Sequence, residues 1–191
     1  MRELKKDEIF TLFEEINRRL ALEDKHGEIL VTGGAALTLV FNARTSTYDI
    51  DAVFHPIDDM RKVISNMTDE LGLPHNWIND SVKTFVTDKL KFEVFRSYSN
   101  LSVSIIDAES LLAMKLTSAR FGSKDMDDSI FLMKLLDIQT EQALLDILDK
   151  YIDPFLRKTN VKHFVKETFE KYQGFQRKPS LMEKLKSAKR Q

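Results

Sequence analysis

The sequence of 191 residues contains no cysteine, which excludes disulfide bonds, thiolate metal sites and cysteine nucleophiles. It has four prolines, and no stretch approaches the roughly 18 consecutive apolar residues that a membrane-spanning helix requires. The formal net charge is only -1, so the chain as a whole is not a strong binder of polyanions. From these absences we expect a soluble cytoplasmic protein with no membrane contact, in which any binding of nucleic acid would need a local basic patch.

The hydrophobic pattern predicts an α+β protein with a sufficient core, since 42% of the residues are apolar. Helices are predicted around Leu4 to Leu20, at 35–43, from Pro56 to about Gly72, and at about 107–121, 125–138, 140–152 and 160–173. Strands are predicted at 29–31, 48–54, 82–86, 90–95 and 101–106. We therefore predict an α+β core with an N-terminal helix (1–106), a helical region packed on that core (107–176) and a basic tail (177–191).

The turn at Gly33-Gly34 is the first candidate for a binding function. A short apolar strand runs into the two glycines, and a helix begins directly after them. Glycine lets the backbone approach a ligand closely, and the first turn of a helix presents unpaired N–H groups to an anion such as phosphate. The Lys-Ser/Thr pair of a Walker A loop is missing. The alternative interpretation is a tight turn from strand to helix with no ligand.

Two aspartates, Asp49 and Asp51, lie in the next predicted strand. Residues i and i+2 of a strand project from the same face, so both carboxylates point to one place. Two like charges side by side repel each other unless a cation lies between them, and Mg²⁺ is usually held by one or two carboxylates together with substrate phosphates. We therefore predict a site for Mg²⁺ or Mn²⁺ here. A solvated edge strand with two surface acids is the alternative.

This order of elements resembles the nucleotidyltransferase superfamily of polymerase-β-like enzymes. The resemblance rests on the strand, the Gly33-Gly34 turn, one short helix, and the strand that carries Asp49-Ile50-Asp51. It implies a nucleotidyltransferase fold with a small mixed sheet flanked by helices, followed by a helical C-terminal half. It also implies that the glycines hold the phosphates of an NTP, that the two acids bind divalent metal, and that a third carboxylate from a later strand completes the site.

A second block resembles the Lys…Arg…Asp-x-x-Asp signature of abortive-infection-type nucleotidyltransferases, which include toxins of toxin–antitoxin pairs. The block comprises the stretch LLAMKL at 111–116, Ala119-Arg120, and KDMDD at 124–128; the run WINDSVK at 77–83 resembles a less characterised bacterial branch of the group. The resemblance covers about residues 28–140. It implies that Lys115 faces the nucleotide, that Arg120 also binds it, and that at least one of Asp125 and Asp128 contributes to the active site. Salt bridges on a solvated helix surface are the alternative.

The third carboxylate and the turn before the acids complete the set of candidates. Glu93 is the preferred third acid because it lies in a strand between apolar neighbours and faces away from them; Asp107 and then Asp88 are its competitors. An ordinary surface glutamate is the alternative interpretation of Glu93. Arg44 and Thr47 belong to a turn that precedes the acid pair in the related toxins, where a guanidinium and a hydroxyl suit a triphosphate. They can equally cap the strand and pair with a surface acid.

Taken together, the resemblance implies a metal-dependent nucleotidyltransferase that transfers NMP from an NTP to a tRNA-like RNA or a protein. Such a protein would be an enzyme and a candidate toxin with a cognate antitoxin protein as partner, and its basic tail would contact the acceptor. The alternative is a catalytically inactive nucleotidyltransferase fold that binds a nucleotide or a partner chain. A third hypothesis is an antitoxin-like protein whose helical half docks another protein.

Overall fold

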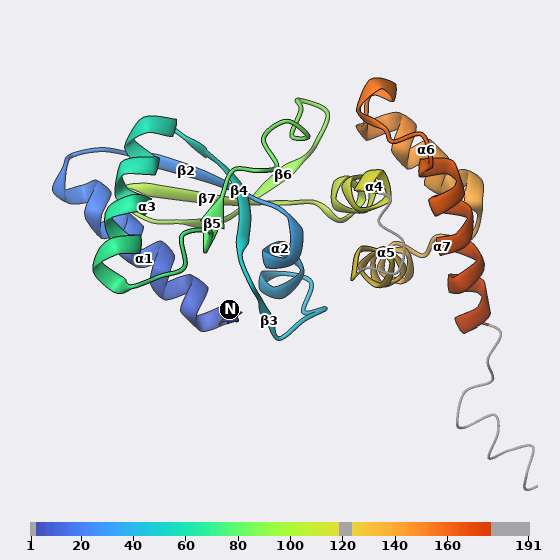
Figure 1. Cartoon of the computed structure of the whole chain (residues 1–191), viewed down its shortest axis with the longest axis horizontal. Helices are drawn as coiled ribbons and strands as arrows, with labels where there is room; N and C mark the ends of the chain where they lie inside the picture. Colours follow the sequence, from blue (N-terminus) through green and yellow to red (C-terminus); the bar gives the residue numbers. More distant parts are fainter. Residues whose placement is uncertain (1–2, 119–123, 177–191) are drawn as a thin grey trace, which may run out of the picture. The chain divides into compact units, whose positions relative to one another are not determined.

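The computed structural model describes residues 3–118 and 124–176, and the chain divides into two compact units, residues 1–111 and 112–191. Within the described residues, the first unit contains the strands and the second consists of helices (Figure 1). The elements are β1 (Leu4–Lys5), α1 (Lys6–Leu22), β2 (Gly27–Val31), α2 (Gly33–Leu39), β3 (Ser46–Thr47), β4 (Ile50–His55), α3 (Ile57–Leu71), β5 (Ile78–Asn79), β6 (Phe92–Ser97), β7 (Leu101–Ile106), α4 (Ala108–Ser118), α5 (Lys124–Leu135), α6 (Glu141–Tyr151), η1 (Pro154–Leu156) and α7 (Val161–Gln176).

The main sheet is mixed, with five strands in the order β5-β4-β2-β7-β6. The central strand β2 pairs with β4 in the antiparallel direction and with β7 in the parallel direction. At the two edges, β5 runs parallel to β4, and β6 runs antiparallel to β7. The predicted α+β fold, with a small mixed sheet flanked by helices and a helical C-terminal half, is confirmed.

One face of this sheet is covered by helices α1 and α3, which contact each other and contact β7 and β4, respectively. Ile50, Ala52 and Phe54 of β4 point toward these helices and are buried, whereas the intervening Asp51 and Val53 are only half-buried. The alternation follows from the two-residue period of a strand. Asp51 therefore belongs to the sheet face opposite α1 and α3.

The prediction of a strand over residues 82–86 is wrong. Residues 81–85 form turns in which Lys83 N–H donates to the carbonyl of Asp80 and Phe85 N–H donates to that of Val82. These local bonds occupy backbone groups that a strand would pair with a neighbour, and a side-chain ion pair between Lys83 and Asp80 joins the same turn. The edge strand is instead the two-residue β5 at Ile78–Asn79, immediately upstream.

A second, two-stranded sheet joins β1 to β3, and no pattern in the sequence predicted it. Leu4, expected in the first helix, pairs instead with Thr47, and Lys5 pairs with Ser46. Helix α1 then begins at Lys6. The backbone N–H of Lys5, the residue before the helix, donates to the carboxylate of Glu8 in the first turn. The N-terminal segment is therefore attached to the loop that leads into β4.

The second unit contains α5, α6 and α7, with α7 packed against both of the others. The end of α6 is held by Arg157, whose guanidinium donates to the carbonyls of Leu148 and Ile152 and pairs with Asp149. Such bonds satisfy carbonyls that have no partner within the helix. No helix among the described residues is long and apolar enough to cross a membrane.

Candidate functional site

Gly33, at the start of α2, lies against the carboxylate of Asp51 on the neighbouring strand. Its φ of +61° is a left-handed conformation that L side chains rarely adopt. A Cβ atom built on Gly33 would lie 2.7 Å from Oδ2 of Asp51, which is closer than real Cβ contacts allow. The backbone N–H of Thr32 donates to the carbonyl of Asp51 at 2.8 Å and connects the two strands at this point. Glycine at this position therefore permits both the turn and the approach of the acid.

Gly34 makes the equivalent close contact with the loop before β4. A Cβ atom on Gly34 would lie 2.7 Å from Oγ1 of Thr47 and 3.4 Å from Nη1 of Arg44. The predicted hydroxyl and guanidinium thus lie at the second glycine of the turn. Since Gly33 and Gly34 are consecutive, the loop residues and Asp51 surround the same turn.

Asp49 is connected to this group through its backbone. The hydroxyl of Thr47 donates to the carbonyl of Asp49 at 3.1 Å, and β4 begins at the next residue. Ile50, between the two acids, is fully buried, and its N–H donates to the carbonyl of Trp77. Asp49 and Asp51 are both half-buried, so their carboxylates lie near the surface on either side of a buried residue.

These contacts bring together six residues that the sequence proposed for phosphate and metal: Gly33, Gly34, Arg44, Thr47, Asp49 and Asp51. The donor set fits Mg²⁺, since this ion usually keeps several waters and takes one or two protein carboxylates plus substrate phosphates. The guanidinium supplies donors that match phosphate oxygens. Within residues 3–118 and 124–176, no group of three or more acidic or histidine side chains is arranged to hold a metal ion.

Glu93, proposed as the third carboxylate, is not brought together with the acid pair. It is exposed on the edge strand β6, three strand spacings or about 14 Å from β4. Across the sheet, Glu93 lies opposite Ile105, Ile105 lies opposite Val31, and Val31 lies opposite Ala52. Residues that lie opposite one another on neighbouring strands share a face of the sheet, so Glu93 shares the face of Ala52. Glu93 therefore lies on the face of α1 and α3, and Asp51 lies on the other face.

The two competitors for the third carboxylate have other positions. Asp107 receives a hydrogen bond at 2.7 Å from the backbone N–H of Ser110, so its side chain caps the start of α4. Asp88 is exposed in the turns between β5 and β6. Among the described residues no third acidic side chain is arranged with Asp49 and Asp51 to hold a metal ion, so the third carboxylate stays a prediction.

In the second unit, Lys115 forms a buried ion cluster with Asp125 and Asp128. The Nζ atom lies 2.7 Å from Oδ1 of Asp125 and 2.9 Å from Oδ2 of Asp128, and the hydroxyl of Ser118 donates to Oδ2 of Asp125. The two aspartates are 4% and 5% exposed, so the salt bridges of the alternative interpretation form, but in a buried position and not on a solvated surface. Lys115 thus pairs with both carboxylates. Arg120 and the basic tail from Arg177 lie outside the described residues.

The structure adds three residues near the site that the sequence patterns did not indicate. Glu3 accepts a hydrogen bond from the hydroxyl of Ser46 at 2.5 Å and another from the hydroxyl of Tyr48. The bond to Glu3 raises the pKa of Tyr48 above its ordinary value. These contacts depend on the pairing of β1 with β3, which joins segments some forty residues apart and leaves no local signal.

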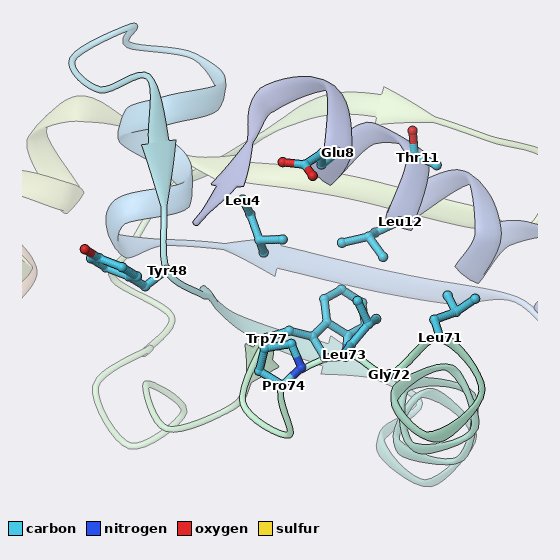
Figure 2. A pocket seen from close by; sticks show the side chains of 10 residues that line it. All are labelled: Leu4, Glu8, Thr11, Leu12, Tyr48, Leu71, Gly72, Leu73, Pro74 and Trp77. Carbon is cyan, nitrogen blue, oxygen red and sulfur yellow. The ribbon is translucent and has the colours of Figure 1, made fainter. Parts of the chain in front are cut away.

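A separate hollow of about 340 Å³ lies beside this loop, between α1 and the turn that follows α3 (Figure 2). Tyr48 of the loop and the buried Trp77 both line it. Its lining is Leu4, Glu8, Thr11, Leu12, Tyr48, Leu71, Gly72, Leu73, Pro74 and Trp77. The hollow therefore borders the loop that precedes Asp49 but contains none of the six residues gathered at the glycine turn.

Comparison with known proteins identifies the family of the chain. The model of a family described as "Nucleotidyltransferase of unknown function (DUF6036)" matches residues 7–178. No curated protein matches the sequence. A solved structure that resembles the chain is an antigenic nucleotidyltransferase-like protein from Paracoccidioides brasiliensis, with 14% sequence identity and a TM-score of 0.46 over 86% of this chain and 95% of that chain. The family match covers most of both units.

Proposed function

The chain belongs to the family of nucleotidyltransferases of unknown function, and from this membership we propose that it transfers NMP from an NTP to an acceptor in a metal-dependent reaction. The observation that carries the proposal is the fit of the Gly33-Gly34 turn to Asp51 on one side and to Thr47 and Arg44 on the other. A structural turn needs no acid and no guanidinium at its glycines. An acid and a guanidinium at the glycines suit a phosphate-binding turn beside a metal site, since carboxylates bind Mg²⁺ and a guanidinium pairs with phosphate oxygens.

Asp49 and Asp51 would hold the divalent ion, Mg²⁺ or Mn²⁺. When bound, this ion would supply positive charge that neutralises the phosphate oxygens of the NTP. Two carboxylates side by side also repel one another, so the pair itself favours a cation. The half-buried position of both acids keeps them accessible to a substrate that brings the remaining oxygen ligands.

The glycine turn and Arg44 would hold the β- and γ-phosphates. The amides of Gly33 and Gly34 lie at the start of α2, where backbone N–H groups have no partner within the helix. In the reaction, the acceptor oxygen forms a bond to the α-phosphorus and the bond from that phosphorus to the bridging oxygen breaks. Pyrophosphate leaves with the electron pair, and the proton of the acceptor hydroxyl passes to water.

The acceptor, the toxin role and the second block of residues are part of the proposal. The resemblance to abortive-infection-type proteins supports a tRNA-like RNA or a protein side chain as acceptor, and an antitoxin protein as partner. It also supports roles for Lys115, Asp125 and Asp128 in the reaction. Their ion cluster is compatible with such a role, since a lysine held by two carboxylates has a defined position.

A transfer assay tests the proposal. Purified protein is incubated with each of the four α-labelled NTPs, Mg²⁺ and total RNA, and label on RNA and on protein is measured. We expect label from at least one NTP and loss of the label in Asp49→Ala. Asp58→Ala is the matched control, because Asp58 is an exposed acid in the first turn of α3, and it should label as the wild type does. No label on RNA or protein with any NTP would contradict the enzymatic proposal.

The position of Glu93 favours one alternative, a nucleotide-binding module without turnover. The superfamily pattern implies a third carboxylate beside the acid pair. Glu93, the predicted third carboxylate, lies on the face of α1 and α3, whereas Asp51 lies on the other face. This alternative predicts that the protein binds an NTP with Mn²⁺ in a calorimetric titration and transfers no label. The same Asp49→Ala variant would then lose metal binding alone.

A further inference from the structure

Thr47 has a buried hydroxyl whose single donor is already used. The side chain belongs to a residue only 5% exposed, and its Oγ1 donates to the carbonyl of Asp49 at 3.1 Å. The same oxygen packs so closely on Gly34 that a Cβ there would lie 2.7 Å from it. A hydroxyl has one hydrogen to donate, and the oxygens of a nucleotide phosphate need donors. Thr47 could donate to phosphate only by giving up its bond to Asp49.

We propose that Thr47 is a positioning residue for the acid pair and that its hydroxyl does not bind phosphate. Its bond holds the backbone of Asp49, and its contact with Gly34 connects that acid to the glycine turn. The inference rests on the proposed function, because it assigns Asp49 to the metal. It replaces the sequence-based expectation that the Thr47 hydroxyl contacts the triphosphate.

The other side of the loop is held by the N-terminal segment. Thr47 pairs with Leu4 in the β1–β3 ladder, and the side chains on either side of it, Ser46 and Tyr48, both donate to Glu3. Successive side chains of an extended chain point in opposite directions, so Ser46 and Tyr48 lie toward the N-terminal segment while Thr47 lies toward Gly34. The loop is therefore fixed from both sides, as a positioning role requires.

Arg44 has a different chemistry at the same glycine. Its Nη1 lies 3.4 Å from the Cβ position of Gly34, and a guanidinium carries five N–H donors and a permanent positive charge. A guanidinium can contact phosphate while it keeps other bonds, which a threonine hydroxyl cannot. The two loop residues thus have different roles: Arg44 binds phosphate, and Thr47 holds the backbone of Asp49.

The test compares Thr47→Val, which removes the hydroxyl at nearly constant shape, with Thr47→Ser, which keeps it. Thr45→Val is the control, since Thr45 is an exposed threonine two residues away. Mn²⁺ affinity is measured by calorimetry without nucleotide, and hydrogen exchange of the peptide covering residues 46–51 is measured without metal. We expect Thr47→Val to bind Mn²⁺ about tenfold more weakly, the usual scale for losing a residue that orients a metal ligand. We also expect faster exchange in that peptide, whereas Thr47→Ser and Thr45→Val stay within about twofold of wild type.

Other outcomes overturn the inference or the proposed function separately. If Thr47→Val binds Mn²⁺ and exchanges as the wild type does, but loses affinity for Mn²⁺-ATP, Thr47 is a phosphate ligand and the inference is wrong. If the wild type binds Mn²⁺ neither alone nor together with ATP, the proposed function fails, and the exchange measurement still decides whether Thr47 holds the loop. Thr47→Ala, measured in the same way, replaces Thr47→Val if the valine variant does not fold.

Discussion

A Cβ atom on Gly33 would lie 2.7 Å from Oδ2 of Asp51, so the turn after β2 and the acid on β4 fit each other only because the turn residue is glycine. The positive φ of Gly33 and this contact are two independent reasons for glycine at one position. They can be separated experimentally, because Gly72 has nearly the same φ, +62°, and nothing within 4 Å of its Cβ position.

Gly33→Ala should disturb the site, whereas Gly72→Ala should only strain the backbone. Each alanine is expected to cost about 1–2 kcal/mol of unfolding free energy from the left-handed backbone conformation. Only Gly33→Ala also pushes the Asp51 carboxylate away, so only this variant should lose Mn²⁺ and NTP affinity, by about tenfold or more. Urea unfolding and calorimetry measure the two effects. Equal losses of ligand affinity in both variants would contradict the fit between Gly33 and Asp51.

Lys115→Met should strongly destabilise the second unit. The substitution keeps the apolar stem but removes the cation shared by Asp125 and Asp128, whose side chains are each 6% exposed. Removing one partner from a buried ion pair typically costs about 3 kcal/mol or more. Urea unfolding followed by circular dichroism measures the change.

The control for this prediction is Lys171→Met, because Lys171 pairs with the neighbouring but exposed Asp127. Exposed pairs contribute at most about 1 kcal/mol. The triple variant Lys115→Met, Asp125→Asn, Asp128→Asn should recover part of the lost stability, since it removes the two buried negative charges that lose Lys115. A Lys115→Met protein as stable as Lys171→Met would mean that the cluster does not stabilise the fold.

Stability should depend on pH through Glu15 on α1. Hydrogen bonds from Arg18 and then Arg19, opposed by burial, lower the pKa of Glu15 from 4.5 to about 2. A carboxylate with a lowered pKa in the folded state stabilises it above the unfolded pKa, and the contribution disappears as the pH falls from about 4.5 to about 2.

Glu15→Gln should therefore lower the unfolding free energy by about 1 kcal/mol at pH 7, since the pairs are near the surface. The difference from wild type should shrink below pH 4.5 and vanish below about pH 2. Glu14→Gln, an exposed neighbour on the same helix, should leave the unfolding free energy at pH 7 within about 0.5 kcal/mol of the wild-type value. A constant difference across this pH range would mean that charge on Glu15 is not its cause.

Thr68→Val should weaken the packing behind β4. The indole N–H of Trp77 donates to Oγ1 of Thr68 at 2.9 Å, and both side chains are buried. Without the hydroxyl, a buried donor loses its partner, at a cost of about 2 kcal/mol. Trp77 is the sole tryptophan, so its fluorescence reports both the environment and the unfolding midpoint. Thr68→Ser keeps the hydroxyl and should retain the wild-type emission; a wild-type midpoint in Thr68→Val would exclude this hydrogen bond as a source of stability.

The order of the elements was largely predictable because it depends on local pattern. The period of apolar residues indicated α1, α3 and the helices of the second unit, and the apolar run before Gly33 indicated β2. The strand predicted over 82–86 failed because local turn bonds around Asp80 and Val82 replaced cross-strand pairing. Periodicity over five residues cannot distinguish these two uses of the same backbone groups.

The amino-acid sequence by itself determined which residues are available for chemistry: two glycines after a strand, two aspartates in i and i+2 positions, and no cysteine. Only the tertiary structure decided that Asp51 lies against Gly33 and that Thr47 lies against Gly34. It also placed Glu93 on the opposite face of the sheet and Glu3 beside the loop. The physical reason is that strand register and the β1–β3 pairing depend on contacts between distant segments, and a shift of one residue in register moves every side chain to the other face.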